Sequence, residues 1–170
     1  DEDAANLREF VLAMARDVRV VIIKLCDRLH NMRTLEFLDE KKRFEIANIT
    51  LEIYAPLAGR LGMTRIKCEL EDLCLFWLHP DDYREIERKI ALWNEKHQQL
   101  HEDIKLFLLL YLRTQFPHIE MSSRGKHFYS IWHKMKKQNL DFEEIYDITA
   151  VRILCNSIEE CYAIHGMIVA

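Results

Sequence analysis

Three cations and a hydroxyl lie close together in the run SRGKHFYSIWHKM, which occupies positions 123–135 of this 170-residue chain. Lys126, Ser130 and Lys134 recur every four residues, so a helix beginning at about Lys126 would place them on one face. Arg124 would stand just before that helix, where backbone N–H groups and the positive end of the helix dipole favour an anion. This pattern suits a polyphosphate. The alternative is a set of solvated lysines on an amphipathic surface helix.

A carboxylate follows at the entrance to a predicted strand. The run ITAVRILC is β-branched and apolar, and it predicts a buried strand over residues 147–155 with Asp147 at its mouth. A carboxylate near cations that are arranged for phosphate is a suitable ligand for Mg²⁺ bridging phosphate oxygens.

This stretch resembles the synthetase domain of the RelA/SpoT family, the bacterial enzymes that make and destroy guanosine tetra- and pentaphosphate. The family pattern is close to G-R-P-K-H-x-Y-S-I-x-x-K-M followed by D-x-x-A-V-R, and it aligns without gaps with residues 123–135 and 147–152. The resemblance implies contacts to the phosphates of ATP, a positioning hydroxyl and a Mg²⁺ ligand. These roles would fall to Arg124, Lys126 and Lys134, to Ser130, and to Asp147, respectively.

Two positions depart from the family pattern. Ser123 stands in place of the usual glycine and Gly125 in place of the usual proline. Losing the glycine would crowd a tight turn and losing the proline would loosen it, so an altered turn is expected before the helix. This difference keeps open a second class of function, a non-catalytic nucleotide-binding or regulatory interaction module.

A second candidate site lies on a long helix predicted over residues 6–37, with a break near Asp17. Val18, Ile22, Leu25, Leu29 and Met32 form an apolar stripe, and Asp27, Asn31 and Thr34 form a polar stripe opposite. Because other apolar residues lie near the polar stripe, the helix is expected to be buried inside a helical domain. A buried aspartate needs a cation or hydrogen-bond donors, so Asp27 is a candidate metal ligand. A salt bridge to a nearby arginine or lysine is the alternative.

The segment VVIIKLCDRLHNMRTL at 20–35 resembles the last metal-binding helix of the family's HD-type hydrolase domain, with Cys26 in place of an alanine. The resemblance implies that Asp27 binds Mn²⁺ and that Asn31 and Thr34 line the site of the guanosine nucleotide. The remaining ligands of such a site are a histidine and a consecutive His-Asp pair. The chain contains no His-Asp dipeptide, so these ligands are expected upstream of Asp1.

The elements that must position these groups are mainly helical. A helix over 41–61 with a kink at Pro56, a helix over 65–78 with Thr64 as its N-cap, and a helix of about 34 residues from Asp81 to near Gln115 are predicted. His97 and His101 on the last of these are assigned to a solvated face, because no carboxylate completes a metal site. A short strand over 118–123 and a helix from about Ser157 complete the prediction.

Composition limits the classes of function. A net charge of −4 gives no global basic field, so direct binding of nucleic acid is not expected. Five cysteines without a C-x-x-C pair favour reduced thiols in a cytoplasmic protein. The longest apolar run, at 106–112, is too short to cross a bilayer, so no membrane association is expected.

The predicted fold class is mainly α with an α+β C-terminal part, divided into three regions. They are the end of an HD-type hydrolase domain (1–62), a helical connector (63–116) and the start of a nucleotidyltransferase-like synthetase domain with a mixed sheet (117–170). By resemblance, the parent enzyme would transfer pyrophosphate from ATP to the 3′-hydroxyl of GTP or GDP and would hydrolyse the 3′-pyrophosphate of ppGpp and pppGpp. Regulation by a partner such as the ribosome is part of the same expectation. The chain itself is expected to be an excised piece, incomplete for both reactions.

Overall fold

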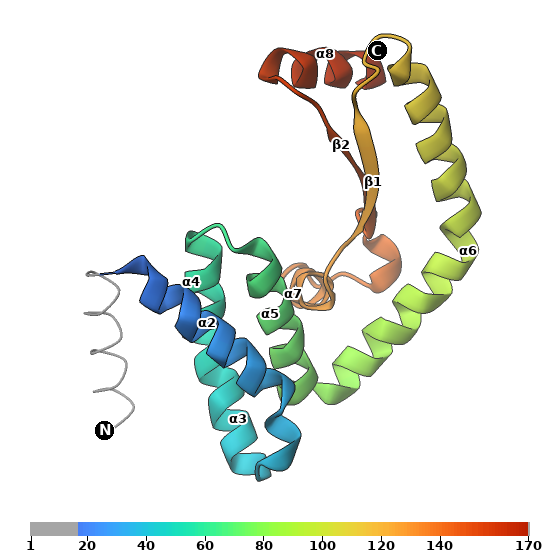
Figure 1. The fold of residues 1–170 in the computed structure, drawn as a ribbon. Helices are drawn as coiled ribbons and strands as arrows, with labels where there is room; N and C mark the ends of the chain where they lie inside the picture. Colours follow the sequence, from blue (N-terminus) through green and yellow to red (C-terminus); the bar gives the residue numbers. More distant parts are fainter. Residues whose placement is uncertain (1–16, 170) are drawn as a thin grey trace. The chain divides into compact units, whose positions relative to one another are not determined.

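The computed structural model describes residues 17–169 and confirms the predicted fold class, with helices throughout and one small sheet near the C-terminus (Figure 1). The chain separates into two compact units, the first ending at Arg84 and the second beginning at Glu85. The three functional regions predicted from the sequence stay a prediction, since the two units are defined by contacts within the fold and do not test where one function ends and the next begins.

Within the described residues, the first unit starts with helix α2 (Val18–Arg33), whose N-terminus lies at the predicted break near Asp17. The part of the predicted helix before this break, residues 6–16, lies outside the described residues. The Asp17 carboxylate accepts a 2.9 Å hydrogen bond from the backbone N–H of Arg19 and so caps the helix. Only one stripe of α2 is buried, and its members are Val21, Leu25, Leu29 and Met32. The prediction that α2 is surrounded by the domain is therefore wrong for the described residues, where Val18 is 53% and Ile23 is 68% exposed.

Helices α3 (Glu40–Ile49) and α4 (Ala55–Arg60) are joined by one π-helical turn, η2 (Thr50–Tyr54). Pro56 has no N–H to donate to the carbonyl of Glu52, so one regular helical hydrogen bond is lost here. The π-helical turn, which is wider than an α-helical turn, occurs at this point. The buried Thr50 hydroxyl donates to the carbonyl of Ile46 at 2.7 Å, which satisfies it. Gly62 follows α4 with a φ of +74°, which a side chain would disfavour.

Helix α5 (Thr64–Leu78) packs against α2, α3 and α4 and completes the first core. Its N-cap is Met63, so Thr64 is the first helical residue and not the cap that the sequence predicted. Two polar contacts join α5 to α2. The indole of Trp77 donates to the carbonyl of Met32 at 3.1 Å, and the Arg33 guanidinium donates through two nitrogens to Glu69.

The second unit is organised along helix α6 (Pro80–Arg113). Pro80 is its first residue, so Asp81, which the sequence predicted as the cap, lies inside the first turn instead. His97 and His101 are half-buried against Trp93, with ring centroids 4.5 and 5.1 Å away, so their predicted solvated face is wrong.

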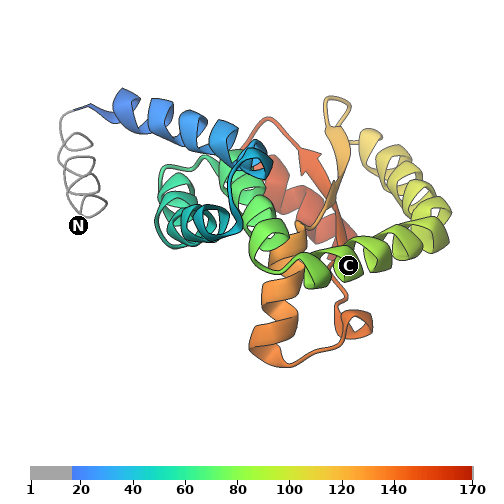
Figure 2. The same cartoon turned by 90° about the horizontal axis from the view of Figure 1, so that it is seen from below.

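Strands β1 (Glu120–Gly125) and β2 (Thr149–Leu154) form an antiparallel pair, with Gly125 opposite Thr149 and Glu120 opposite Leu154 (Figures 1 and 2). Helix α7 (Phe128–Gln138) follows β1, the short helix η3 (Phe142–Glu144) leads towards β2, and α8 (Ile158–Val169) follows β2. The Ser157 hydroxyl accepts from the N–H of Glu160 at 3.2 Å, which caps α8 where the sequence predicted its start.

Two apolar clusters hold the second unit together. One joins the start of α6 to α7 and the 142–148 segment, through Ile86, Ile131, Phe142, Ile145 and Ile148. The other joins the end of α6 to the sheet and α8, through Leu112, Ile119 and Ile164. No helix within residues 17–169 is long and apolar enough to span a membrane.

Candidate functional site

The end of the two-stranded sheet brings Lys126 and Asp147 together. The backbone N–H of Lys126 donates to the carbonyl of Ile148 at 2.8 Å, which extends the ladder one step beyond the Gly125–Thr149 pair. Lys126 therefore lies outside the helix, and α7 begins at Phe128 with His127 in an extended conformation. The prediction that Lys126 shares a helical face with Ser130 and Lys134 is wrong, because sheet pairing holds its backbone.

Helix α7 supplies the second cation. Its inner face packs into the apolar cluster through the fully buried Ile131 and the partly buried Trp132 and Met135. Ser130 and Lys134 are one turn apart, on one side of the helix, as the sequence predicted for this pair. Packing of the inner face thus fixes the direction in which Lys134 extends.

Both lysines contact Asp147. The Lys126 Nζ lies 2.5 Å from Asp147 Oδ2 and the Lys134 Nζ lies 3.0 Å from Oδ1, so each carboxylate oxygen has its own cation. The lysine side chains are mostly covered, with 23% and 31% exposed, whereas Asp147 is 58% exposed. Hydrogen bonds from Lys126 and then Lys134 lower the pKa of Asp147 to about 2, so the carboxylate is ionised at neutral pH.

Arg124 does not stand at the start of the helix, as the sequence predicted, but lies in β1 opposite Ala150. Residues opposite each other share a sheet face, and alternation along β2 places Arg152 on that same face. Both arginines are exposed. Arg152 is a further candidate to which sequence reasoning gave no role, and a single cation alternating with apolar residues in the strand TAVRIL was the available signal.

The altered turn predicted from Ser123 and Gly125 is also wrong, since both residues lie in regular pairs of β1, opposite Val151 and Thr149. A Cβ placed at Gly125 would meet nothing within 4 Å. The residues that depart from the family pattern therefore neither crowd nor strain the backbone beside Lys126.

On α2, Asp27 and Asn31 are four residues apart, on one exposed side of the helix. Thr34 is the C-cap, and its hydroxyl donates to the carbonyls of His30 and Asn31 at 3.1 and 3.2 Å. The structure thus keeps the predicted polar stripe and gives Thr34 a structural role at the helix end.

The burial argument for a metal at Asp27 does not hold, because this carboxylate is exposed in the described part of the chain. Within residues 17–169 the Asp27 side chain has no ion pair, so no described arginine or lysine forms the alternative salt bridge. No group of three His, Cys, Asp or Glu side chains suited to a metal gathers among the described residues. Asp27 can supply one metal ligand, and its role stays a prediction.

The two candidate sites offer different chemistry. The cluster of Lys126, Lys134 and Asp147 has two cations for one anion, with Arg124 and Arg152 on the adjoining sheet face. Such a surface favours a ligand with several negative charges in a chain whose net charge is −4. The polar face of α2 instead offers a carboxylate, which has no ion pair among the described residues, and an amide, which suit a cation and a hydrogen-bonding ligand.

Family models match both ends of the chain. A model described as an HD domain matches residues 1–64, which include Asp27, Asn31 and Thr34. A model described as a region found in RelA/SpoT proteins matches residues 123–170, which include the cluster around Asp147.

Curated relatives match nearly the whole chain. A probable guanosine-3′,5′-bis(diphosphate) 3′-pyrophosphohydrolase from Synechocystis is 47% identical over 95% of this chain and 21% of its own length. A GTP pyrophosphokinase from Myxococcus xanthus is 40% identical over 99% of this chain and 22% of its own length. A bifunctional (p)ppGpp synthase/hydrolase, RelA of Mycobacterium tuberculosis, is 42% identical over 98% of this chain and 22% of its own length. The chain spans about a fifth of the length of these relatives.

Proposed function

Because this chain belongs to the RelA/SpoT family, we propose that it is the part of a guanosine tetra- and pentaphosphate enzyme that carries pieces of two opposed active sites. In synthesis, pyrophosphate passes from ATP to the 3′-hydroxyl of GTP or GDP. In hydrolysis, the 3′-pyrophosphate is removed. The names of the relatives cover both reactions, which supports assigning one to each end of the chain.

The contact of Lys126 and Lys134 with Asp147 carries the synthetic half of the proposal. The two ammonium groups and the guanidinium of Arg124 would hold the phosphates of ATP, and the Ser130 hydroxyl would position them. Their catalytic contribution is orientation of the pyrophosphoryl group and neutralisation of its charge. We add Arg152 to this set, since it shares the sheet face of Arg124.

A divalent cation fits this donor set. These families are metal-dependent, and Mg²⁺ is the cation proposed here. Mg²⁺ is commonly held by one or two carboxylates together with phosphate oxygens and water, so the ionised Asp147 is a suitable ligand. Each of its oxygens accepts from one lysine in this structure, and a carboxylate oxygen has a second lone pair that could face a cation. When bound, the cation would neutralise phosphate charge.

The hydrolytic half rests on the polar face of α2. Asp27 would supply one ligand to Mn²⁺, whose chemistry is activation of water, while Asn31 and Thr34 would line the guanosine nucleotide. The match of residues 1–64 to an HD domain supports this assignment. The Thr34 hydroxyl is less available to a nucleotide than the side chains of Asp27 and Asn31, because it already donates to two carbonyls at the end of α2. A cytoplasmic location and a regulatory partner such as the ribosome stay predictions.

The test is a pair of substitutions in the full-length protein, assayed separately for the two reactions. Asp147→Asn removes the charge that organises Lys126 and Lys134. It should reduce pyrophosphate transfer by about a hundredfold or more, the range typical for removal of an electrostatic group from a transition state. Asp27→Asn should remove release of 3′-pyrophosphate in the presence of Mn²⁺. Each variant should keep the other activity, which makes the two variants controls for each other's folding.

Loss of both activities in each variant would contradict the division into two sites. If the unmodified protein performed neither reaction yet bound guanosine nucleotides, the chain would belong to a non-catalytic binding module instead. The regular backbone around Ser123 and Gly125 lends that alternative no support.

A further inference from the structure

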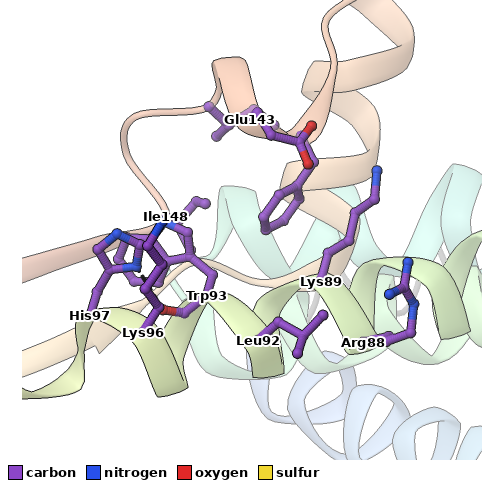
Figure 3. Close-up of a pocket in the computed structure, with 10 residues that line it drawn as sticks. Arg88, Lys89, Leu92, Trp93, Lys96, His97, Glu143 and Ile148 are labelled. Carbon is purple, nitrogen blue, oxygen red and sulfur yellow. Dashed lines mark hydrogen bonds between the residues drawn. The ribbon is translucent and has the colours of Figure 1, made fainter.

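A groove of about 460 Å³ lies along α6 in the second unit, outside the groups proposed to hold ATP (Figure 3). One wall is α6 between Arg88 and His97, and the other is the segment from Phe142 to Ile148. A volume of this size lies within the range of roughly 300–1,000 Å³ that is common for small-molecule sites.

The apolar part of the groove lining is already packed. Phe142, Ile145 and Ile148 are at most 4% exposed and belong to the apolar cluster shared with α6 and α7. The Trp93 ring is stacked on His97, with their centroids 4.5 Å apart, and His97 Nδ1 lies 2.7 Å from the carbonyl of Trp93. These contacts hold an aromatic surface in place before any ligand arrives.

The charged side chains that line the groove are mainly positive. Arg88, Lys89 and Lys96 line the α6 wall, whereas Glu143 is the acid on the facing wall. Lys89 extends from α6 towards that wall, but Glu85 already pairs with it at 3.1 Å (Figure 3). Arg88 and Lys96 make no ion pair within residues 17–169, so their charges are available to a ligand.

We propose that this groove binds a small aromatic anion, whose ring lies against Trp93 and whose anionic group is held by Lys96, while Arg88, about two turns earlier on α6, adds positive charge. An aromatic ring gains contact area and stacking on the indole, the ammonium provides charge-assisted hydrogen bonds, and the guanidinium adds to the positive potential along the groove. Neither a neutral ring nor a small inorganic anion uses both features. The groove is therefore expected to prefer a ligand that carries both an aromatic ring and an anionic group.

The groove also adjoins the candidate synthetic site. Ile148 forms part of the wall, and its carbonyl is the group that accepts the backbone N–H of Lys126. A ligand that packs against Ile148 would therefore contact the segment that positions Asp147.

The experiment is a titration of the chain with naphthalene-2-sulfonate, followed through the indole N–H signals of its three tryptophans by NMR. The Trp93 signal should move saturably, whereas the signal of Trp77, which is bonded to Met32 in the first unit, should stay in place. Lys96→Gln should weaken binding about three- to tenfold, as expected for one charged hydrogen bond near a surface, and Arg88→Gln should weaken it less because it removes only a more distant charge. Arg113→Gln, at the far end of α6, is the matched control and should not change the affinity.

Naphthalene-2-methanol, which keeps the ring and lacks the charge, tests the anionic part. It should bind the unmodified chain about three- to tenfold more weakly than the sulfonate and should bind the Lys96→Gln variant as it binds the unmodified chain. Equal affinity for the neutral and charged rings would overturn the proposal, because the groove would then be only an apolar surface. A Trp93 signal that does not respond to the sulfonate would overturn it as well.

Discussion

At Asp147, one carboxylate faces two ammonium groups, and these contacts make the stability of the fold depend on pH. The lysine contacts lower the pKa of the carboxylate to about 2. A carboxylate whose pKa is lower in the folded than in the unfolded chain stabilises the fold above the unfolded pKa, near 3.9. That contribution is lost as the pH falls from about 4 through 2. It is smaller than about 1 kcal/mol, because Asp147 is 58% exposed and solvent screens both pairs.

The first prediction concerns this pKa. In a carboxylate NMR titration, Asp147 should have a midpoint near 2 in the unmodified chain. Lys134→Met should raise the midpoint towards the ordinary aspartate value, since it removes one of the two hydrogen bonds that lower it. Lys137→Met, an exposed lysine on the same helix, is the control and should leave the midpoint unchanged. A midpoint that responds equally to both variants would mean that general charge, and not the contact, sets the pKa.

Helix α2 shows how an element with apolar residues on several sides is buried on only one. Leu25 is fully buried and Ile23 is 68% exposed, although both are large aliphatic residues in the same helix. The neighbouring α5 decides between them, because it contacts α2 on one side.

The second prediction compares these two positions by urea unfolding. Leu25→Ala should lower the free energy of unfolding by about 2–5 kcal/mol, because it leaves a cavity in a packed core. Ile23→Ala should change it by less than about 0.5 kcal/mol, the usual size of a surface substitution. Equal losses would show that the outer side of α2 is also covered.

The C-terminus of α7 offers a third prediction. Asn139 is the C-cap, with φ 51° and ψ 47°, and its N–H donates to the carbonyl of Met135. Asparagine and glycine tolerate this left-handed conformation, whereas a β-branched residue does not. Asn139→Val should therefore lower the free energy of unfolding by about 1–2 kcal/mol. Asn139→Gly should be close to neutral, and a loss as large as that of the valine variant would contradict the conformational explanation.

At the scale of the whole molecule, the two proposed reactions oppose each other, so activity at both sites at once would consume ATP without net product. We expect reciprocal regulation through the helices between the sites. Helix α6 begins in the first unit and continues through the second, which makes its continuity at Arg84 and Glu85 the feature to test.

The fourth prediction uses two double variants of the full-length protein. Replacing Arg84 and Glu85 by glycine should weaken α6 by about 1 kcal/mol per residue relative to alanine. Replacing both by alanine removes the same ion pairs, to Asp81 and Lys89, but keeps the helix propensity. We expect a non-reactive ATP analogue with GDP to inhibit hydrolysis in the unmodified and alanine proteins, and to inhibit it less in the glycine protein. Equal inhibition in all three would argue against coupling through α6.

The sequence by itself determined the order and type of the elements and the chemistry of the candidate residues. Asp17, Gly62 and Ser157 mark helix ends through local backbone chemistry, and a periodic pattern predicted the long helix α6. The motif around Lys126 and Lys134, followed by a carboxylate at the start of a predicted strand, identified the members of the cluster at Asp147.

Tertiary structure decided which side of each element is covered and which backbone groups pair. Pairing of β1 with β2 took Lys126 out of the predicted helix and placed Arg124 beside Arg152. Packing against α5 selected Leu25 over Ile23 for burial and left Asp27 exposed. These outcomes depend on partners that are distant in the sequence, so local propensity and periodicity contain no information about them.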